Sequence, residues 1–165
     1  MQVKRIDAES AELLDPGSAA WRRARSARVV LSPTPLAIQP TDYVRASWKG
    51  RPYGKVSSMR VGALHNGRDI FFRLAWEDGD ADSKIADINQ FVDAAAVLFP
   101  IAPDAPLLGM GTQGKPVNAW FWRADLGEKP LSVTASGRGT SQRHVDNPLV
   151  SGWNWEAGTW RVVLG

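Results

Sequence analysis

Short stretches in which every second residue is apolar recur along the chain. The clearest spans 70–76, where four apolar side chains would share one face of an extended strand. The same alternation recurs in 117–123, 131–135 and 160–164. Asn66-Gly67, a dipeptide that tolerates positive φ at both central positions of a tight turn, predicts a hairpin over 58–77.

The segment 91–100 is apolar at every position except Asp93. A strand with two apolar sides is typical of burial on both faces, and the length of the segment and its closing Pro100 favour a strand over a short helix. We expect Asp93 to be hydrogen-bonded or paired, because an unpaired buried charge is costly.

Residues 1–57 carry weaker patterns. Several prolines and the turn signal Asp15-Pro16-Gly17 interrupt them, and they include a basic run at 21–28 and a short candidate strand at 28–31. We therefore predict one domain, with 1–57 as an irregular N-terminal arm and first strand and 58–165 as the core. Strands joined by turn-rich connections, without an amphipathic helix longer than two turns, predict an all-β fold: an antiparallel β-sandwich or a flattened barrel.

Composition narrows the possible chemistry. The 165 residues include no cysteine, which excludes disulfides, thiolate metal sites and covalent c-type haem. The net charge of +3 comes from interleaved charges of both signs, so we expect no nucleic-acid partner. The acidic stretch 77–83 lacks the spacing of a calcium loop and is predicted to be a solvated turn. The sequence has no apolar run long enough to span a membrane and no secretory signal at its start.

No hydrolase arrangement is recognisable around the two histidines, so we do not expect an independent enzyme. The candidate chemistry is at Met110, which lies between Gly109 and Gly111 in a loop joining two apolar strands. Flanking glycines let the backbone approach a bulky group closely, and a thioether is a soft, neutral ligand for haem iron. The alternative is that Met110 fills the end of the core, a common role of methionine.

Six segments, in order, are 61–67, 72–78, 91–100, 109–111, 116–122 and 158–164. Their order and spacing resemble the haem b-binding γ subunits of DMSO-reductase-type molybdenum enzymes. That family includes subunits of ethylbenzene and dimethylsulfide dehydrogenases, chlorate and selenate reductases and nitrite oxidoreductase. The resemblance covers roughly 58–164, with a looser match from Asp15 to Trp21.

The resemblance implies one non-covalent b haem in a β-sandwich similar to DOMON and carbohydrate-binding modules. Met110 matches the axial methionine of the family, and the lack of cysteine agrees with a haem that is not covalently attached. Trp120 and Trp122 follow the methionine loop closely, either as rings packed on the porphyrin or as ordinary core aromatics.

Members of the family commonly use a lysine near the C-terminus as the second axial ligand. The present chain ends at Gly165, before the segment that carries this lysine, and we expect it to be truncated. The alternatives are that His144 or Lys115 replaces the lysine, or that the haem is five-coordinate or absent.

The implied function is electron transfer within a heterotrimer that also contains a molybdopterin catalytic subunit and an iron–sulfur subunit. Electrons would pass between the iron–sulfur subunit and an external cytochrome or similar carrier, and the run 21–28 is a candidate docking edge. The resemblance implies a periplasmic location, whereas the lack of a signal leaves the cytoplasm as the alternative. Two other functions stay open: a carbohydrate-binding module with exposed tryptophans, and an interaction module without a small ligand.

Overall fold

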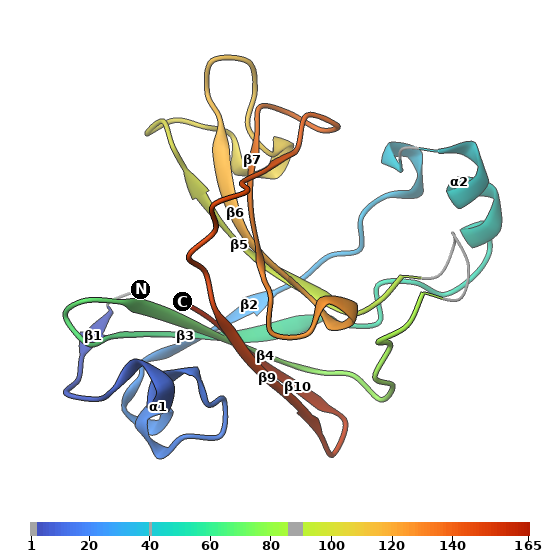
Figure 1. The fold of residues 1–165 in the computed structure, drawn as a ribbon. Coiled ribbons are helices and arrows are strands. Elements are labelled where there is room, and N and C mark those ends of the chain that lie inside the picture. Colours follow the sequence, from blue (N-terminus) through green and yellow to red (C-terminus); the bar gives the residue numbers. More distant parts are fainter. Residues whose placement is uncertain (1–2, 40, 86–90) are drawn as a thin grey trace.

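Two β-sheets packed face to face form the architecture of the chain (Figure 1). The computed structural model describes residues 3–39, 41–85 and 91–165. Sheet A contains β1 (Lys4–Arg5), β2 (Ser26–Val30), β3 (Ser58–His65), β4 (Ile70–Glu77), β9 (Ser151–Glu156) and β10 (Thr159–Leu164). Sheet B contains β5 (Ala94–Pro100), β6 (Val117–Arg123), β7 (Leu131–Ala135) and β8 (Gln142–Arg143). The predicted antiparallel β-sandwich is confirmed.

The strand order places the two ends of the sequence in the same sheet. In sheet A the order is β3-β4-β10-β9, and both N-terminal strands pair with the free edge of β3. β2 pairs antiparallel with the first part of β3, and β1 pairs parallel with Leu64 and His65 at its end. In sheet B the order β5-β6-β7-β8 is antiparallel throughout.

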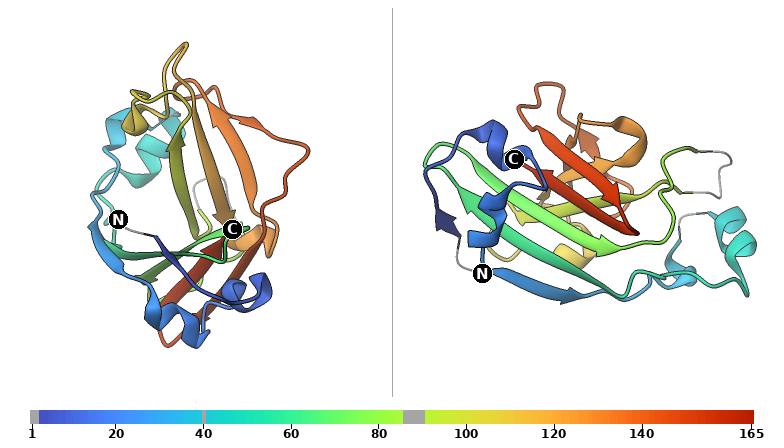
Figure 2. Two further views of the ribbon diagram at one scale, coloured as in Figure 1. Left: turned by 90° about the vertical axis from the view of Figure 1, so that its left-hand side faces the viewer. Right: turned by 90° about the horizontal axis from the view of Figure 1, so that it is seen from below.

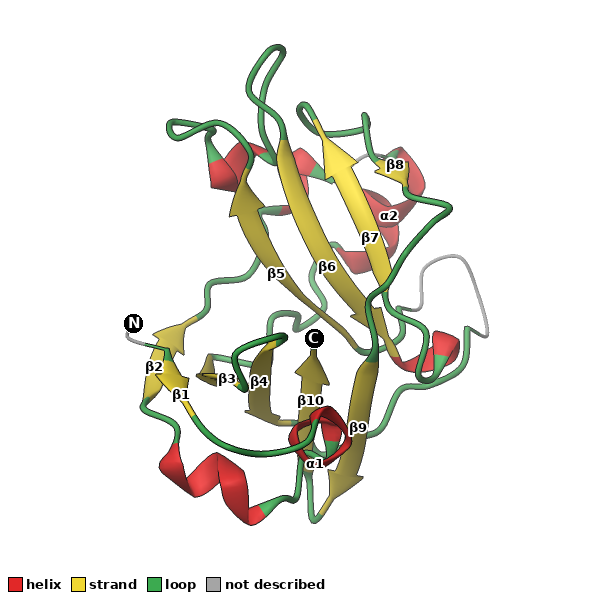
Figure 3. Cartoon of the chain, turned by 60° about the vertical axis from the view of Figure 1, so that its left-hand side comes forward, coloured by secondary structure: helices red, strands yellow, loops and turns green. Residues whose placement is uncertain are grey.

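Helices are short and lie outside the two sheets (Figure 3). The α-helices are α1 (Ser10–Leu14) and α2 (Asp42–Trp48), and the 3-10 helices are η1 (Ala19–Arg23), η2 (Leu36–Ile38), η3 (Leu107–Gly109) and η4 (Ala124–Leu126). α2 begins after Thr41, whose hydroxyl accepts a hydrogen bond from the backbone N–H of Val44. Within the described ranges, no helix has the length and apolar character that a membrane crossing requires.

Most predicted strands are observed near their predicted positions. β6 and β7 have the predicted bounds, β10 begins one residue earlier, and β2 begins two residues earlier than expected. The predicted hairpin is formed by β3 and β4, and the side chain of Asn66 accepts hydrogen bonds from the backbone N–H groups of Arg68 and Asp69. The tight two-residue turn is not formed, because the loop between the paired His65 and Ile70 has four residues. Gly67 has a positive φ of 99°, whereas Asn66 does not.

The prediction that 91–100 is buried on both faces is wrong. The strand begins at Ala94 and lies at the edge of sheet B, with Ala94 and Ala96 exposed and Ala95 buried between them. An apolar composition does not distinguish an edge strand with small exposed alanines from a central strand covered on both sides. The tertiary arrangement decided which of the two was formed.

Tryptophan rings dominate the core between the sheets. Trp122 from sheet B is fully buried, with ring centroids 5.1 Å from Trp160 and 6.3 Å from Trp76 of sheet A. Leu74, Val162 and Leu164 complete the sheet A side of this core. Alternation along the strands therefore directs these residues inward and leaves the intervening ones on the outer face of sheet A.

The N-terminal segment covers one end of that outer face (Figure 2). Leu13 of α1 and Trp21 of η1 are buried against Leu64, Phe71 and Val163 of sheet A. The indole N–H of Trp21 donates a hydrogen bond to the carbonyl oxygen of Asp15 at 3.1 Å. A second apolar core thus fixes the N-terminal segment on the sheet.

Candidate functional site

Met110 lies in a tight turn at the end of sheet B. It follows η3 in the left-handed backbone conformation, at φ 56° and ψ 44°, and its N–H donates a hydrogen bond to the carbonyl oxygen of Leu107 at 3.0 Å. Its own carbonyl oxygen accepts a hydrogen bond from the N–H of Gly137 at 2.9 Å. Non-glycine residues seldom adopt this conformation, so the turn holds Met110 in a specific and costly geometry.

The two glycines beside Met110 have different environments. Gly111 has φ +81°, and a Cβ added there would lie 2.7 Å from the carbonyl oxygen of Ala135 and 2.8 Å from that of Lys115. Only glycine fits this position. A Cβ on Gly109 would meet nothing within 4 Å, so that side of the turn is open to an approaching group.

The side chain of Met110 is half-buried and packs against a small apolar cluster formed by Ala105, Val117 and Ala135, together with Leu98 and Ala102. Val117 and Ala135 are directly paired across β6 and β7. Because neighbouring residues of a strand point to opposite faces, these two lie on the outer face of sheet B, whereas Trp120 and Trp122 point toward sheet A. The structure therefore does not bring Met110 together with Trp120 and Trp122.

The two candidate tryptophans differ in accessibility. Trp122 is enclosed by Trp76, Trp153 and Trp160, and its indole N–H has no hydrogen-bond partner among the described residues. A ligand could contact Trp122 only by displacing these rings. Trp120 is half-buried and packs against Phe72 and Phe99, with centroid distances of 5.8 and 4.9 Å.

The two internal candidates for a second iron ligand already have partners. The Nε2 atom of the exposed His144 lies 2.6 Å from the hydroxyl oxygen of Thr134. The ammonium group of Lys115 forms an ion pair with Asp104, and an amine must lose its proton before it can bind iron. Neither side chain is available in this arrangement without breaking its present contact.

These observations test how far the residues present fit a haem. Met110 carries a soft thioether that could serve as one ligand of a haem iron, and the neighbouring Gly109 has open space beside it. Within the described part of the chain, no group of three or more histidine, cysteine, aspartate or glutamate side chains is placed to hold a metal ion. Of the three predicted iron ligands, Met110, His144 and Lys115, only Met110 has a side chain without a hydrogen bond or ion pair to another described residue.

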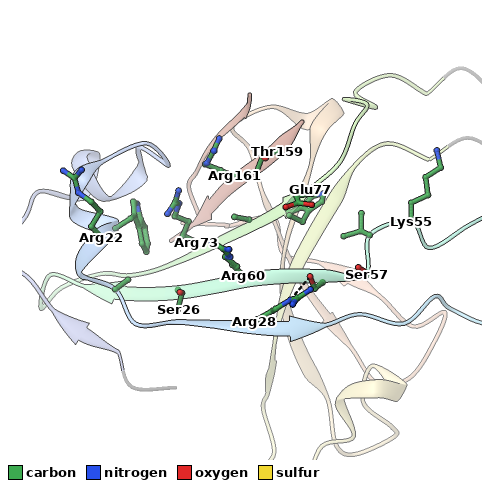
Figure 4. A pocket seen from close by; sticks show the side chains of 17 residues that line it. Arg22, Ser26, Arg28, Lys55, Ser57, Arg60, Arg73, Glu77, Thr159 and Arg161 are labelled. Atoms are coloured by element: carbon green, nitrogen blue, oxygen red, sulfur yellow. Dashed lines mark hydrogen bonds between the residues drawn. The ribbon is translucent and has the colours of Figure 1, made fainter. Parts of the chain in front are cut away.

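A hollow of about 740 Å³ lies elsewhere, on the outer face of sheet A (Figure 4). Gly62 and Ala75, two small residues on the central strands β3 and β4, contribute to its floor. The basic residues that line it are Arg22, Arg28, Lys55, Arg60, Arg73 and Arg161, and we call this site the basic groove. Glu77 is the one acidic residue among its described lining.

Arg73 is a half-buried arginine of the basic groove. Burial lowers the pKa of its guanidinium group, the positive charge of Arg161 lowers this pKa further, and the negative charge of Asp15 partly opposes the effect. Arg161 is 3.9 Å from the carboxylate of Glu156, the longest ion-pair contact among the described residues. The groove thus concentrates positive charge that this chain neutralises only weakly.

Part of the basic groove was predictable from the sequence. The run 21–28 identified Arg22 and Arg28, whereas Arg60, Arg73 and Arg161 come from three separate strands. Each is a single basic residue on the polar side of an alternating strand, and only the pairing of the strands brings them together.

Three comparisons relate the chain to known proteins. It is 33% identical over 150 residues to a putative respiratory nitrate reductase heme subunit of Haloferax mediterranei, covering 90% of this chain and 50% of that protein. It is 32% identical over 166 residues to the chlorate reductase subunit gamma of Ideonella dechloratans, covering 98% of this chain and 64% of that protein. The chain thus spans between half and two thirds of the length of these relatives. A family profile described as ethylbenzene dehydrogenase matches residues 18–164, which extends the predicted resemblance into the N-terminal segment. The chain therefore belongs to the ethylbenzene dehydrogenase family, as its sequence pattern predicted.

Proposed function

We propose that this chain is a haem-binding electron-transfer subunit of a molybdenum oxidoreductase complex and does not itself catalyse the reaction. The family match supports the proposal, as do two relatives whose names describe a heme subunit of nitrate reductase and a gamma subunit of chlorate reductase. The absence of cysteine agrees with a non-covalent b-type haem. The observation that carries the proposal is the turn at Met110, which combines a half-buried thioether with open space beside Gly109.

The residues of the turn would each have a defined task. Gly111 fixes the path of the backbone, the bond from Gly137 to the carbonyl oxygen of Met110 anchors the turn to the segment after β7, and Met110 presents its sulfur. A bound haem would supply one-electron chemistry, and thioether ligation favours its reduced state.

The partners and the location belong to the same proposal. We place the subunit between an iron–sulfur subunit of the complex and an external carrier such as a cytochrome, with a molybdopterin subunit as the site of catalysis. We assign the complex to the periplasm, in line with the family resemblance; cell fractionation with an antibody to this chain tests that assignment.

The carbohydrate-binding alternative receives less support from the aromatic residues. Among the described tryptophans, Trp153 and Trp155 on β9 are the exposed ones, at 38% and 37%. Trp153 packs against Trp122 and Trp160, and the indole N–H of Trp155 donates a hydrogen bond to the carbonyl oxygen of Asp78 at 2.9 Å. Both rings are therefore held by the protein on one side, and sugar stacking is not needed to explain them.

The decisive experiment is a haem spectrum of the purified complex, with two matched methionine variants. Met110→Leu removes the thioether but nearly preserves side-chain volume, so packing changes little. We expect it to shift the absorption bands of reduced haem and lower the reduction potential, while a pyridine haemochrome assay identifies the haem as b-type.

Met59→Leu is the control, because Met59 is another half-buried methionine but lies on β3 in the core between the sheets. Identical spectra and potentials for Met110→Leu, Met59→Leu and the unmodified protein would show that Met110 only fills space.

A further inference from the structure

The basic groove contains a row of arginines that crosses four strands of sheet A. Arg28 on β2 pairs with Arg60 on β3, Arg60 pairs with Ala75 on β4, and Ala75 pairs with Arg161 on β10. Arg73 lies two residues from Ala75 and on the same face. Like charges placed directly opposite each other on paired strands destabilise a sheet, so this row has a cost in the isolated chain.

Unpartnered polar atoms gather at the same place. The Nε atom of Arg73 is buried and has no hydrogen-bond partner among the described residues. The buried Nη1 atom of Arg161 makes no hydrogen bond either, and its contact with the carboxylate of Glu156 is a long one, at 3.9 Å. The side-chain oxygen of Asn154, which pairs with Arg161 in the next strand, is also buried without a partner, but it is an acceptor and would need a donor such as a backbone N–H. Buried donors in native proteins are nearly always paired, which indicates that an acceptor from another molecule completes this site.

The dimensions favour an extended ligand over a compact ion. Three strand spacings separate β2 from β10, a span of about 14 Å that roughly four residues of extended chain would cover. A single oxyanion reaches two or three of these cations at most. A nucleic acid would use exposed aromatic rings for stacking, but Trp21 and Trp76 in the groove lining are each only 5% exposed.

We propose that the basic groove binds an extended acidic segment of a partner protein, with aspartate or glutamate carboxylates bridging Arg73 and Arg161. Guanidinium groups pair with carboxylates through two parallel hydrogen bonds, which would satisfy the buried donors. Gly62 has no side chain and Ala75 has only a methyl group, so neither residue fills the floor of the groove. The inference rests on the proposed function only in assigning the segment to a partner subunit, since the site itself requires no haem.

The test measures fluorescence anisotropy of a labelled octaglutamate peptide added to the purified chain, with octaglutamine as the uncharged probe. We expect octaglutamate alone to bind, with an affinity that falls as salt rises. Arg73→Gln/Arg161→Gln should weaken binding by about tenfold or more. Arg138→Gln/Arg143→Gln makes the same change in net charge on exposed residues outside the groove and should weaken it by less than about twofold.

Ala75→Leu provides a second variant, which leaves the charge unchanged but fills the floor of the groove. It should weaken peptide binding as strongly as Arg73→Gln/Arg161→Gln does. Circular dichroism of each variant confirms that it is folded. Equal losses for the groove and control pairs would overturn the proposal, since only net charge would then matter. Displacement of the peptide by sulfate or citrate at equal charge concentration would also overturn the proposal, because it would identify a site for small anions. Haem absorbance of Arg73→Gln/Arg161→Gln is read in parallel, so a failure of this inference is separated from a failure of haem binding.

Discussion

Gly111 and Gly114 occupy the same short loop with similar backbone conformations, at φ +81° and +76°. They differ in the space around them. A side chain at Gly111 would collide with two carbonyl oxygens, whereas a Cβ at Gly114 would meet nothing within 4 Å. Alanine at Gly114 therefore measures the cost of a left-handed backbone alone, whereas alanine at Gly111 adds the cost of a steric clash.

We expect Gly111→Ala to destabilise the protein by about 3 kcal/mol and Gly114→Ala by about 1 kcal/mol. Urea denaturation followed by tryptophan fluorescence measures both values. Because Met110 is directly bonded to Gly111, Gly111→Ala should also weaken haem binding, while Gly114→Ala should not. Similar stabilities for the two variants would mean that the turn relaxes and does not hold Met110 rigidly.

The sequence signal for this turn was a methionine between two glycines, and the structure shows that the two glycines differ. A side chain at Gly111 would clash with the backbone, whereas Gly109 has open space beside it. The flanking glycines predicted close approach of the backbone to a bulky group, but not the left-handed conformation of Met110 itself. Its packing on the outer face of sheet B could not, because it depends on how the loop 101–116 returns to the sheet. The Nε2 contact of His144 with Thr134 likewise requires the pairing of β7 with β8.

At the scale of elements, the N-terminal segment is held by a few buried side chains. α1 has five residues, too few to be stable alone, so its position depends on tertiary packing. Leu13 is fully buried in the second apolar core, against the outer face of sheet A. Docking of this segment also positions η1, which contributes Trp21 and Arg22 to the basic groove.

We expect Leu13→Ala to cost about 3 kcal/mol of unfolding free energy, because it leaves a cavity that the sheet cannot close. Leu108→Ala, at a fully exposed leucine in η3, should change stability by less than about 0.5 kcal/mol. Hydrogen exchange of residues in α1 and η1 would show whether the loss is local. Urea denaturation measures the unfolding free energy of both variants, and an unchanged midpoint for Leu13→Ala would contradict docking of the segment.

Strands were predictable where apolar and polar residues alternate clearly, and they were not predicted where this alternation is weak. β6, β7 and β10 have one apolar and one mixed face, and the sequence pattern located them closely. β1 and β8 have two residues each, too few to show any period, and their existence depends on a neighbouring strand. β9 contains two partly exposed tryptophans at an edge, a pattern that does not separate a strand from a loop.

At the scale of the whole molecule, one carboxylate links the two sheets. The Oδ2 atom of Asp93, just before β5 of sheet B, accepts a hydrogen bond from the indole N–H of Trp160 on β10 of sheet A at 2.8 Å. The same oxygen accepts a bond from the backbone N–H of Asp82 at 2.8 Å. The expectation that Asp93 is hydrogen-bonded is confirmed. Burial nevertheless raises the pKa of Asp93 to about 6, against the lowering effect of these two bonds.

A raised pKa in the folded state makes stability depend on pH in a defined direction. The folded protein holds the Asp93 proton more tightly than the unfolded chain, whose carboxyl has a pKa of 3.8. The contribution of this group is therefore largest below about pH 4, is lost as pH rises through 6, and is constant above that. Asp93→Asn keeps an oxygen acceptor without the charge, so we expect it to remove this dependence of stability on pH. It should also stabilise the protein at neutral pH by about 1 kcal/mol, a figure limited by solvent screening.

Thermal denaturation between pH 4 and 8 measures the difference between Asp93→Asn and the unmodified protein. Asp80→Asn is the control, because Asp80 is an exposed carboxylate in the preceding loop and should leave the slope unchanged. If the stability of Asp93→Asn still falls as pH rises, the pH dependence belongs to another group.

By itself the sequence determined the fold class, the family and the candidate ligand, because alternation, turn dipeptides and the order of motifs are local properties of the chain. The tertiary structure alone decided that β5 is an edge strand, that Met110 and Trp120 lie on opposite faces of sheet B, and that arginines from separate strands line one groove. Each of these depends on register and on the side from which a distant segment packs. Contacts between residues far apart in the chain fix both, and no local pattern contains that information.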